Sequence, residues 1–353
     1  MQRIVDYSAL TRPTTRAEVA AFKSATLASG KKWAAVAPMN FVVIGIVLVL
    51  ALVFLLNSTS SALSAVVRGV FSGSSGASTA IIVPAILVVG LGTLFVVLAT
   101  VFGSSRWKTW MRLSQFADAN GFVFSPSDTK PSYPGSVFAL GHTRFASNHL
   151  RTFAGRFLDY GNYTYVTGSG KTRAEHKWGF LALGLDRSLP HMILDAKSNN
   201  SFFGSNLPSA FSKNQVLSLE GNFDDYFTLY CPEQYETDAL YVFTPDLMAL
   251  LIDEASPFDV EIVDNWMFVY SRGHFSMLEP AVHERLLRIV DTVGAKTLTQ
   301  TARYADERVG NPAANIVAPQ GRRLARGVPA AAILAGLFVL GAIVINIVST
   351  MAR

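Results

Sequence analysis

Cysteine and charged residues are both scarce in this sequence. The single cysteine, Cys231, excludes an intramolecular disulfide framework and any zinc or iron–sulfur site built from several cysteines. Charged residues make up 16 % of the 353-residue chain, whereas a typical soluble domain has about 25 %. Together with an apolar fraction of 50 %, this composition excludes a disordered chain, a coiled coil and a collagen-like fibre.

Motifs for catalysis and metal binding are also missing. The six histidines are scattered, with none in an H-E-x-x-H pattern, and no G-x-S-x-G elbow occurs. Asp224 and Asp225 are adjacent carboxylates, but they lack the central Gly and distal Glu of an EF-hand loop, so we interpret them as solvated loop residues. Cys231 precedes Pro232 and is interpreted as a small buried residue. We therefore expect no catalytic, cofactor-binding or metal residues and no cofactor.

Three long runs without charge stand out instead. They cover residues 34–56, 80–102 and 328–348, and each could cross about 30 Å of hydrocarbon as a helix. The first run is too long, and begins too far along the chain, for a cleavable signal peptide. The predicted fold class is a membrane protein with three transmembrane α-helices plus a soluble α+β domain, built mostly of antiparallel strands and hairpins with a few helices.

Basic and aromatic residues collect beside these runs. The positive-inside rule places the N-terminal arm, residues 1–33, and the long middle segment in the cytoplasm. It places the loop 57–79 and the tail 349–353 outside, which makes the predicted protein multi-pass. We expect contact with the anionic headgroups of a lipid bilayer at these membrane-interface residues: Lys31, Lys32, Trp33, Arg106, Trp107, Lys108, Trp110, Arg112, Arg322, Arg323 and Arg326.

The excess positive charge lies outside the middle segment. Between Leu113 and Gly321 there are 16 Lys and Arg residues against 23 Asp and Glu residues, a net charge of −7, while the whole chain carries +5. An acidic globular part argues against a nucleic-acid partner. In the arm, Thr15 and Glu18 match a capping box, which predicts a short helix ending near Ser29.

The middle segment is long enough for one α+β domain, residues 103–298, followed by a polar tether, residues 299–327. A helix from the second apolar run is expected to stop at Asn120–Gly121. Residues 162–166 and 178–183 are rich in β-formers and predict a hairpin. Further strands are expected at 191–195, 215–219 and 226–230.

The tip of that hairpin contains the string GSGKT, which is part of a nucleotide-binding P-loop motif. The full motif needs a glycine where Tyr165 stands, and a helix after Lys171 and Thr172 that would point its N-terminus at phosphate. The following residues lead into a strand-like run instead. We interpret the string as a flexible hairpin tip.

The last third of the domain predicts alternating elements. Residues 239–243 are expected to form a strand, and Thr244 and Pro245 to start a helix that ends at Ser256–Pro257. Residues 258–262 and 267–270 predict a hairpin across Asp264–Asn265. An amphipathic helix is expected from Glu279 to about Val293.

Part of this pattern resembles a known group of proteins. The runs Leu219–Phe223, Tyr226–Tyr230 and Ala239–Met248 look like a domain in uncharacterised bacterial (actinobacterial-type) multi-pass membrane proteins, in which an acidic F-D-x-x-F stretch precedes an L-T-P-x-x-M helix start. The likeness covers roughly Leu113 to Val293. It implies an α+β cytoplasmic domain and a bacterial plasma membrane, but no activity, because the family has none assigned.

The sequence leaves three classes of function open. The leading interpretation is a non-catalytic, membrane-anchored cytoplasmic interaction or scaffold module, with a protein partner or self-association. The alternatives are a ligand-sensing or enzymatic domain and an oligomeric transport component. A deep pocket with convergent polar groups would favour the former alternative, and an exposed apolar patch or open sheet edge would favour partner binding.

Overall fold

The computed structural model describes residues 4–30, 105–129, 131–200, 211–311, 313–327 and 341. The chain divides into a smaller compact unit, Arg12–Arg112, and a larger one formed by Met1–Thr11 and Leu113–Arg353. A helix covering residues 105–120 contributes its first half to the smaller unit and its second half to the larger one. Each unit is described by itself.

The smaller unit contains α2 (Arg16–Ala28) and the first half of helix 105–120. The capping box is confirmed: the Thr15 hydroxyl accepts from the Glu18 N–H at 3.2 Å, and the Glu18 carboxylate accepts from the Thr15 N–H at 2.7 Å. Phe22 of α2 meets the ring of Trp107 edge-on, with 6.3 Å between centroids. An aromatic contact therefore joins the two helices.

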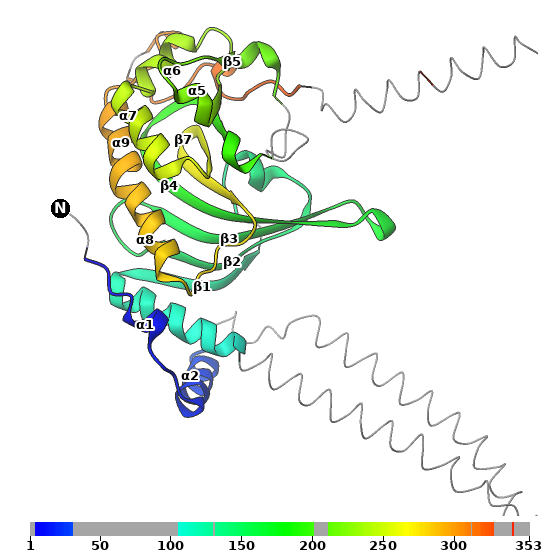
Figure 1. Ribbon diagram of the computed structural model, residues 1–353, viewed down its shortest axis with the longest axis vertical. Helices are drawn as coiled ribbons and strands as arrows, with labels where there is room; N and C mark the ends of the chain where they lie inside the picture. The colour runs from blue at the N-terminus through cyan, green and yellow to red at the C-terminus, as the bar shows by residue number, and fades with distance from the viewer. Residues whose placement is uncertain are drawn as a thin grey trace, which may run out of the picture. The chain divides into compact units, whose positions relative to one another are not determined.

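The larger unit is built on an antiparallel sheet of seven strands (Figure 1). The order is β1-β2-β3-β4-β6-β5, and β7 also pairs with β4. The strands are β1 (Phe122–Thr129), β2 (His142–Thr152), β3 (Leu158–Thr167), β4 (Ala174–Ala196), β5 (Val216–Leu217), β6 (Phe227–Tyr230) and β7 (Asp259–Arg272). β4 pairs with β3 along its first part and with β6 at its end, and it pairs with β7 from Trp178 to Leu194.

Short helices and turns connect the strands, and α7, α8 and α9 stand together along the sheet in Figure 1. Two π-helical turns, η6 and η7, continue α7 and α8. The helices are α1 (Ser8–Thr11), α5 (Phe223–Tyr226), α6 (Glu236–Val242), α7 (Pro245–Leu250), η6 (Leu251–Ala255), α8 (Pro280–Ile289), η7 (Val290–Gly294) and α9 (Ala295–Thr301), and the 3-10 turns are η2 (Ser136–Ala139), η3 (Gly170–Thr172), η4 (Lys197–Asn199), η5 (Lys213–Gln215) and η8 (Pro319–Gly321).

Both faces of the central sheet are buried. On one face the Tyr160 hydroxyl lies 3.1 Å from Nδ1 of His283 in α8, and Gly294 packs against Leu183. On the other face, Phe138 of η2 packs into a cluster of aromatic side chains from the strands: Tyr163, Trp178, Phe180, Phe268 and Tyr270. Because it is covered on both sides, β3 is buried along nearly its whole length.

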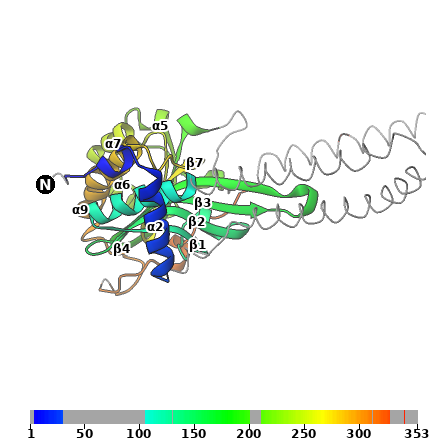
Figure 2. The ribbon, with the colours of Figure 1, turned by 90° about the horizontal axis from the view of Figure 1, so that it is seen from below.

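The hairpin predicted around GSGKT is confirmed. β3 and β4 pair in register from Leu158–Leu183 to Thr167–Ala174, and Figures 1 and 2 show this hairpin extending beyond the other strands. Gly168 has a φ of +67°, and a Cβ there would meet the backbone of Thr172. A 3-10 turn, η3, rather than a longer helix, follows Ser169, so the tip lacks the strand–loop–helix geometry that a P-loop needs.

Two predicted strand assignments are wrong. Residues 239–243 belong mostly to α6, in which Ala239 and Val242 are buried at helical spacing. Residues 258–270 form the single strand β7 rather than a hairpin: Asp264 does have the expected positive φ, +54°, but it lies opposite a bulge in β4 and the strand continues through it. The predicted helix starts at Pro245 and Glu279–Pro280 and the helix stop at Asn120–Gly121 are confirmed.

The predicted fold class has to be corrected. Among the described residues no helix combines the length and the apolar character needed to cross a bilayer, and the dominant feature is a large antiparallel sheet with short helices. The expectation of a multi-pass membrane protein with three transmembrane helices plus an α+β domain is therefore withdrawn. The ranges 34–56, 80–102 and 328–348 themselves lie outside the described residues, apart from Gly341.

Candidate functional site

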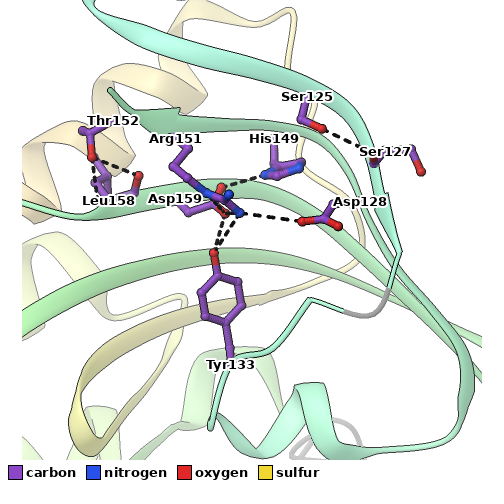
Figure 3. Close-up of polar contacts among 9 residues, drawn as sticks. All are labelled: Ser125, Ser127, Asp128, Tyr133, His149, Arg151, Thr152, Leu158 and Asp159. Atoms are coloured by element: carbon purple, nitrogen blue, oxygen red, sulfur yellow. Dashed lines mark hydrogen bonds and ion pairs between the residues drawn. The ribbon is translucent and has the colours of Figure 1, made fainter. Parts of the chain in front are cut away.

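A fully buried carboxylate, Asp159 on β3, is the centre of the polar cluster in Figure 3. His149 Nδ1 lies 2.8 Å from its Oδ1, and Arg151 Nη2 and the Tyr133 hydroxyl donate to its Oδ2 at 2.9 and 2.5 Å. Burial alone would raise the pKa of Asp159, but the hydrogen bond from His149 and the charges of His149 and Arg151 outweigh it, and the pKa is lowered. Asp159 is therefore ionised at neutral pH and joins β2, β3 and the segment before η2.

This cluster has the wrong surroundings for catalysis. Asp159 and His149 form a pair of the kind that activates a nucleophile, but His149 Nε2 is buried and has no hydrogen-bond partner in the part of the chain that the structure describes. Burial, together with the neighbouring Asp159, raises the pKa of Tyr133, so its hydroxyl stays protonated. We assign the cluster a structural role.

The candidate functional site is a cleft of about 590 Å³ beside α6. One wall is α6, and the other is the segment that follows α9. The Gln300 side chain of α9 donates to the carbonyl oxygen of Tyr241 at 2.7 Å and links the two walls. The cleft is lined by Thr237, Asp238, Tyr241, Arg303, Tyr304, Ala305, Glu307 and Arg308.

A network of charged and phenolic groups fixes the inner part of the cleft. Arg308 pairs with Asp238 at 3.0 Å and with the buried Asp306 at 3.2 Å, and its guanidinium lies 3.9 Å from the ring centre of Tyr235. Tyr304 donates to Asp238 and Tyr235 donates to Asp306, each at 2.7 Å. The Arg308 guanidinium and the two phenols thereby hold both carboxylates in place.

The pKa shifts follow from this network. Burial, followed by the hydrogen bond to Asp238, raises the pKa of Tyr304, and burial with the hydrogen bond to Asp306 raises that of Tyr235. Burial acts to raise the pKa of Asp306, but the N–H of Ala318, the Tyr235 hydroxyl and Arg308 lower it overall. The phenols therefore stay protonated and Asp306 stays ionised, so neither phenol provides a nucleophile at neutral pH.

Two charged side chains at the rim of the cleft have no polar partner among the described residues. Arg303 and Glu307 are exposed, and neither makes a hydrogen bond or an ion pair within the described ranges. On α6, Leu240 and Tyr241 are 51 % and 41 % exposed, values high for large apolar side chains. With Thr237 they occupy positions i, i+3 and i+4 of the helix, which places them on one face.

The polar groups that line the cleft are carboxylates, guanidinium groups, phenols and one aliphatic hydroxyl. The lining includes no histidine or cysteine, as far as the described chain goes. The described residues also contain no group of three or more metal-ligating side chains. The arrangement can bind a ligand through one free cation, one free anion and two apolar side chains.

Eight of the eleven residues predicted at a membrane interface are among the described residues. Lys31, Lys32 and Trp33 are outside the described residues. Trp107 and Trp110 are buried in contact with each other, and the Arg106 guanidinium lies 4.6 Å from the ring centre of Trp110. On the same helix, the side chain of Arg112 donates to the Arg12 carbonyl oxygen, and Lys108 is exposed. In the larger unit, Arg322, Arg323 and Arg326 belong to a segment that packs on the sheet.

Other residues singled out from the sequence are explained locally. Cys231 is buried, and burial with the nearby Glu236 and Asp238 raises the pKa of its thiol to about 12, which confirms the interpretation as an inert buried residue. Asp224 is not a free loop carboxylate, because it accepts hydrogen bonds from the Leu219 N–H and the Ser218 hydroxyl. Asp225 is exposed, as expected.

The sequence did not point to the cleft. Its two walls are about 60 residues apart in the chain. The sequence predicts a strand at Tyr241 and a polar tether at Arg303, so neither residue is expected to line a cleft. The one usable signal was the group of charges around Arg303, Asp306, Glu307 and Arg308, which is dense for a chain so poor in charge.

Comparison with known proteins assigns the chain to no family. No model of a known protein family matches the chain, and no curated protein matches it. A crystal structure of the mycobacterial trehalose monomycolate transport factor A, TtfA, is similar with a TM-score of 0.36 and 12 % identity, over 53 % of this chain and 93 % of that chain. A likeness this low carries no argument about the fold or the function of the present chain.

Proposed function

We propose that the larger unit is a non-catalytic interaction module that binds a segment of a partner protein in the α6 cleft. The observation that carries the proposal is an exposed Arg303, with no polar partner among the described residues, in the same cleft as the exposed Tyr241; Leu240, next to Tyr241 on α6, is exposed as well. Arginine and tyrosine are enriched at the energetic centres of protein interfaces, where an apolar contact and a charged hydrogen bond act together.

A protein segment fits the cleft better than a small metabolite does. Pockets for small molecules are mostly apolar, with a few placed polar groups, whereas five of the eight residues that line this cleft are charged or carry an aliphatic hydroxyl. The exposed apolar side chain of Leu240 is not part of the lining of the cleft but lies on the exposed face of α6. A ligand that uses both must extend from the cleft over α6.

The free charges define the chemistry of that segment. The Arg303 guanidinium matches a carboxylate, which it can bind through two parallel hydrogen bonds. The apolar pair Leu240 and Tyr241 matches a large apolar side chain a few residues away. We therefore expect an acidic residue followed or preceded by an apolar anchor in the partner.

Affinity capture with matched variants tests the proposal. The full chain and its variants Arg303→Ala and Tyr241→Ala would serve as baits in an extract of the source cells, with quantitative mass spectrometry of the retained proteins. We expect a retained protein whose amount falls at least about fivefold with either variant. Lys171→Ala is the matched control, because it also removes one exposed positive charge but lies at the hairpin tip. Retention of the same proteins by all four baits would contradict the proposal.

A further inference from the structure

A second binding groove on the larger unit is filled by the chain's own residues 322–327, which directly follow η8. Arg326 forms an antiparallel bridge with Phe211, and the N–H of Ser212 donates to the carbonyl oxygen of Ala325 at 3.2 Å. The buried side chain of Gln215 accepts from the N–H of Ala325 and donates to its carbonyl oxygen, both at 2.9 Å. Backbone groups are thus recognised as they are in a peptide added to a sheet edge.

One side chain of the segment occupies an apolar pocket. Leu324 is 6 % exposed and packs against Ile193, with Phe211 and Tyr230 beside it. Its N–H donates to Nδ1 of His191 at 3.0 Å. Because Nδ1 accepts this bond, His191 carries its proton on Nε2, which donates to Glu261 at 2.7 Å. Glu261 also accepts hydrogen bonds from Tyr270 and Ser136. These bonds fix Glu261, which in turn holds the His191 ring so that its Nδ1 faces Leu324.

Two further contacts select particular residue types. The Arg323 guanidinium binds both carboxylate oxygens of Asp264, each at 2.9 Å, a geometry that lysine does not reproduce. At Gly327, a Cβ would lie 2.7 Å from the carbonyl oxygen of Phe211. Because the obstructing atoms are backbone, only glycine allows this close approach.

We propose that this groove is a peptide-binding site, occupied in cis by residues 322–327, that also accepts an extended peptide of the pattern Arg-Leu-x-x-Gly from a partner protein. Each specified residue of the pattern is set by one wall: Asp264 for the arginine, the pocket beside Ile193 for the leucine and Phe211 for the glycine. Gln215 binds the backbone between the leucine and the glycine and so selects no side chain there. This site is separate from the α6 cleft and does not depend on the function proposed for it.

The tethered segment competes with any free peptide. A segment joined to its own site has an effective concentration in the millimolar range, so the intact chain should bind a free peptide weakly until the segment is displaced. Substitutions within the segment should therefore open the groove without changing its walls. Gly327→Ala is the sharpest of these, because the added methyl group meets backbone atoms of Phe211.

The test uses the full chain and a fluorescently labelled synthetic peptide with the sequence of residues 321–328, GRRLARGV, measured by fluorescence anisotropy. We expect the peptide to bind Gly327→Ala at least about tenfold more tightly than it binds the wild-type chain. Adding Asp264→Ala to Gly327→Ala should weaken binding at least about fivefold, and a peptide with aspartate in place of its leucine should not bind. Equal binding to the wild-type chain and Gly327→Ala, or no binding to either, would overturn the proposal.

A second variant keeps the proposal testable if the Gly327→Ala chain does not fold. Leu324→Ser also weakens the hold of the segment and leaves the backbone of residue 327 unchanged. The same increase in peptide affinity is expected, and an unchanged affinity in a folded Leu324→Ser chain, checked by circular dichroism, would also overturn the proposal. Partner capture through the α6 cleft should be unaffected by either variant, so failure of one proposal leaves the other standing.

Discussion

The carboxyl group of Asp259 should make the larger unit less stable as the pH rises. Asp259 is 1 % exposed at the start of β7, and its Oδ1 accepts from the N–H of Ala196 at 2.9 Å. Its Oδ2 has no hydrogen-bond partner among the described residues. Burial, assisted by the charge of nearby Asp195, raises the pKa of Asp259 to about 7 from an ordinary value of 3.8.

The sign of the effect follows from proton binding. Between about pH 4 and pH 7 the folded chain keeps a proton on Asp259 that the unfolded chain has released. Because the folded state then binds more protons, the free energy of unfolding falls as the pH rises through this window and is level above it. At about 1.4 kcal/mol per pKa unit, the difference between 3.8 and about 7 corresponds to a loss of about 4 kcal/mol at alkaline pH.

Asp259→Asn removes this titration and keeps a carbonyl oxygen for the bond from Ala196. We expect urea unfolding to give nearly equal stabilities for variant and wild type at pH 4.5, and a variant more stable by about 2–4 kcal/mol at pH 8.5. Asp225→Asn is the control, since Asp225 is exposed, and its stability should parallel that of the wild type at every pH. Parallel curves for Asp259→Asn and wild type across this range would refute the reasoning.

Three further substitutions test the account of the fold. Asp159→Ala should destabilise the larger unit by about 1–3 kcal/mol in urea unfolding, because it leaves His149 and Tyr133 without their acceptor, and an unchanged stability would argue against the structural role of that cluster. Gly135→Ala should destabilise by about 1–3 kcal/mol, because a Cβ would lie 2.2 Å from the Tyr270 hydroxyl oxygen; an unchanged melting temperature would contradict that packing. Lys171→Ala should change the stability by less than about 0.5 kcal/mol, and ATP binding lost with this substitution would refute the assignment of the hairpin tip.

Local signals in the sequence predicted local structure well. The capping box at Thr15 and Glu18, the helix stop at Gly121 and the helix start at Pro245 depend on the chemistry of a few adjacent residues, and all three are confirmed. The β3–β4 hairpin was found because its β-formers flank a glycine-rich turn. These features are decided within a few residues, so no tertiary information is needed.

Features decided by tertiary packing were missed. The stretch 239–243 is rich in β-formers, but the burial of Tyr235, Ala239 and Val242 against the rest of the unit makes it the helix α6. Asp264 has the backbone conformation of a turn, yet pairing with the long strand β4 carries β7 through it. The prediction of three transmembrane helices came from long uncharged runs and the basic and aromatic residues beside them, whereas among the described residues no helix has the length and apolar character to cross a bilayer.

The candidate sites depend on contacts between distant parts of the chain. Tyr241 and Arg303 line the same cleft although about 60 residues separate them in the chain, and Leu324 bonds to His191 across 133 residues. No spacing rule relates such positions, because the topology of the sheet and its helices determines which of them meet. An exposed arginine without a partner can be recognised only when the coordinates of its neighbours are known.

Photo-cross-linking from the α6 cleft tests the central claim most directly. Benzoylphenylalanine would replace Tyr241 in the full chain, and Lys171 in a second chain as the control. After irradiation in the source cells, we predict a cross-linked protein at position 241 that is absent at position 171 and whose yield falls at least about fivefold when Arg303→Ala is added. The same products at both positions, or a yield at position 241 that Arg303→Ala does not change, would contradict the proposed binding of a partner segment in the cleft.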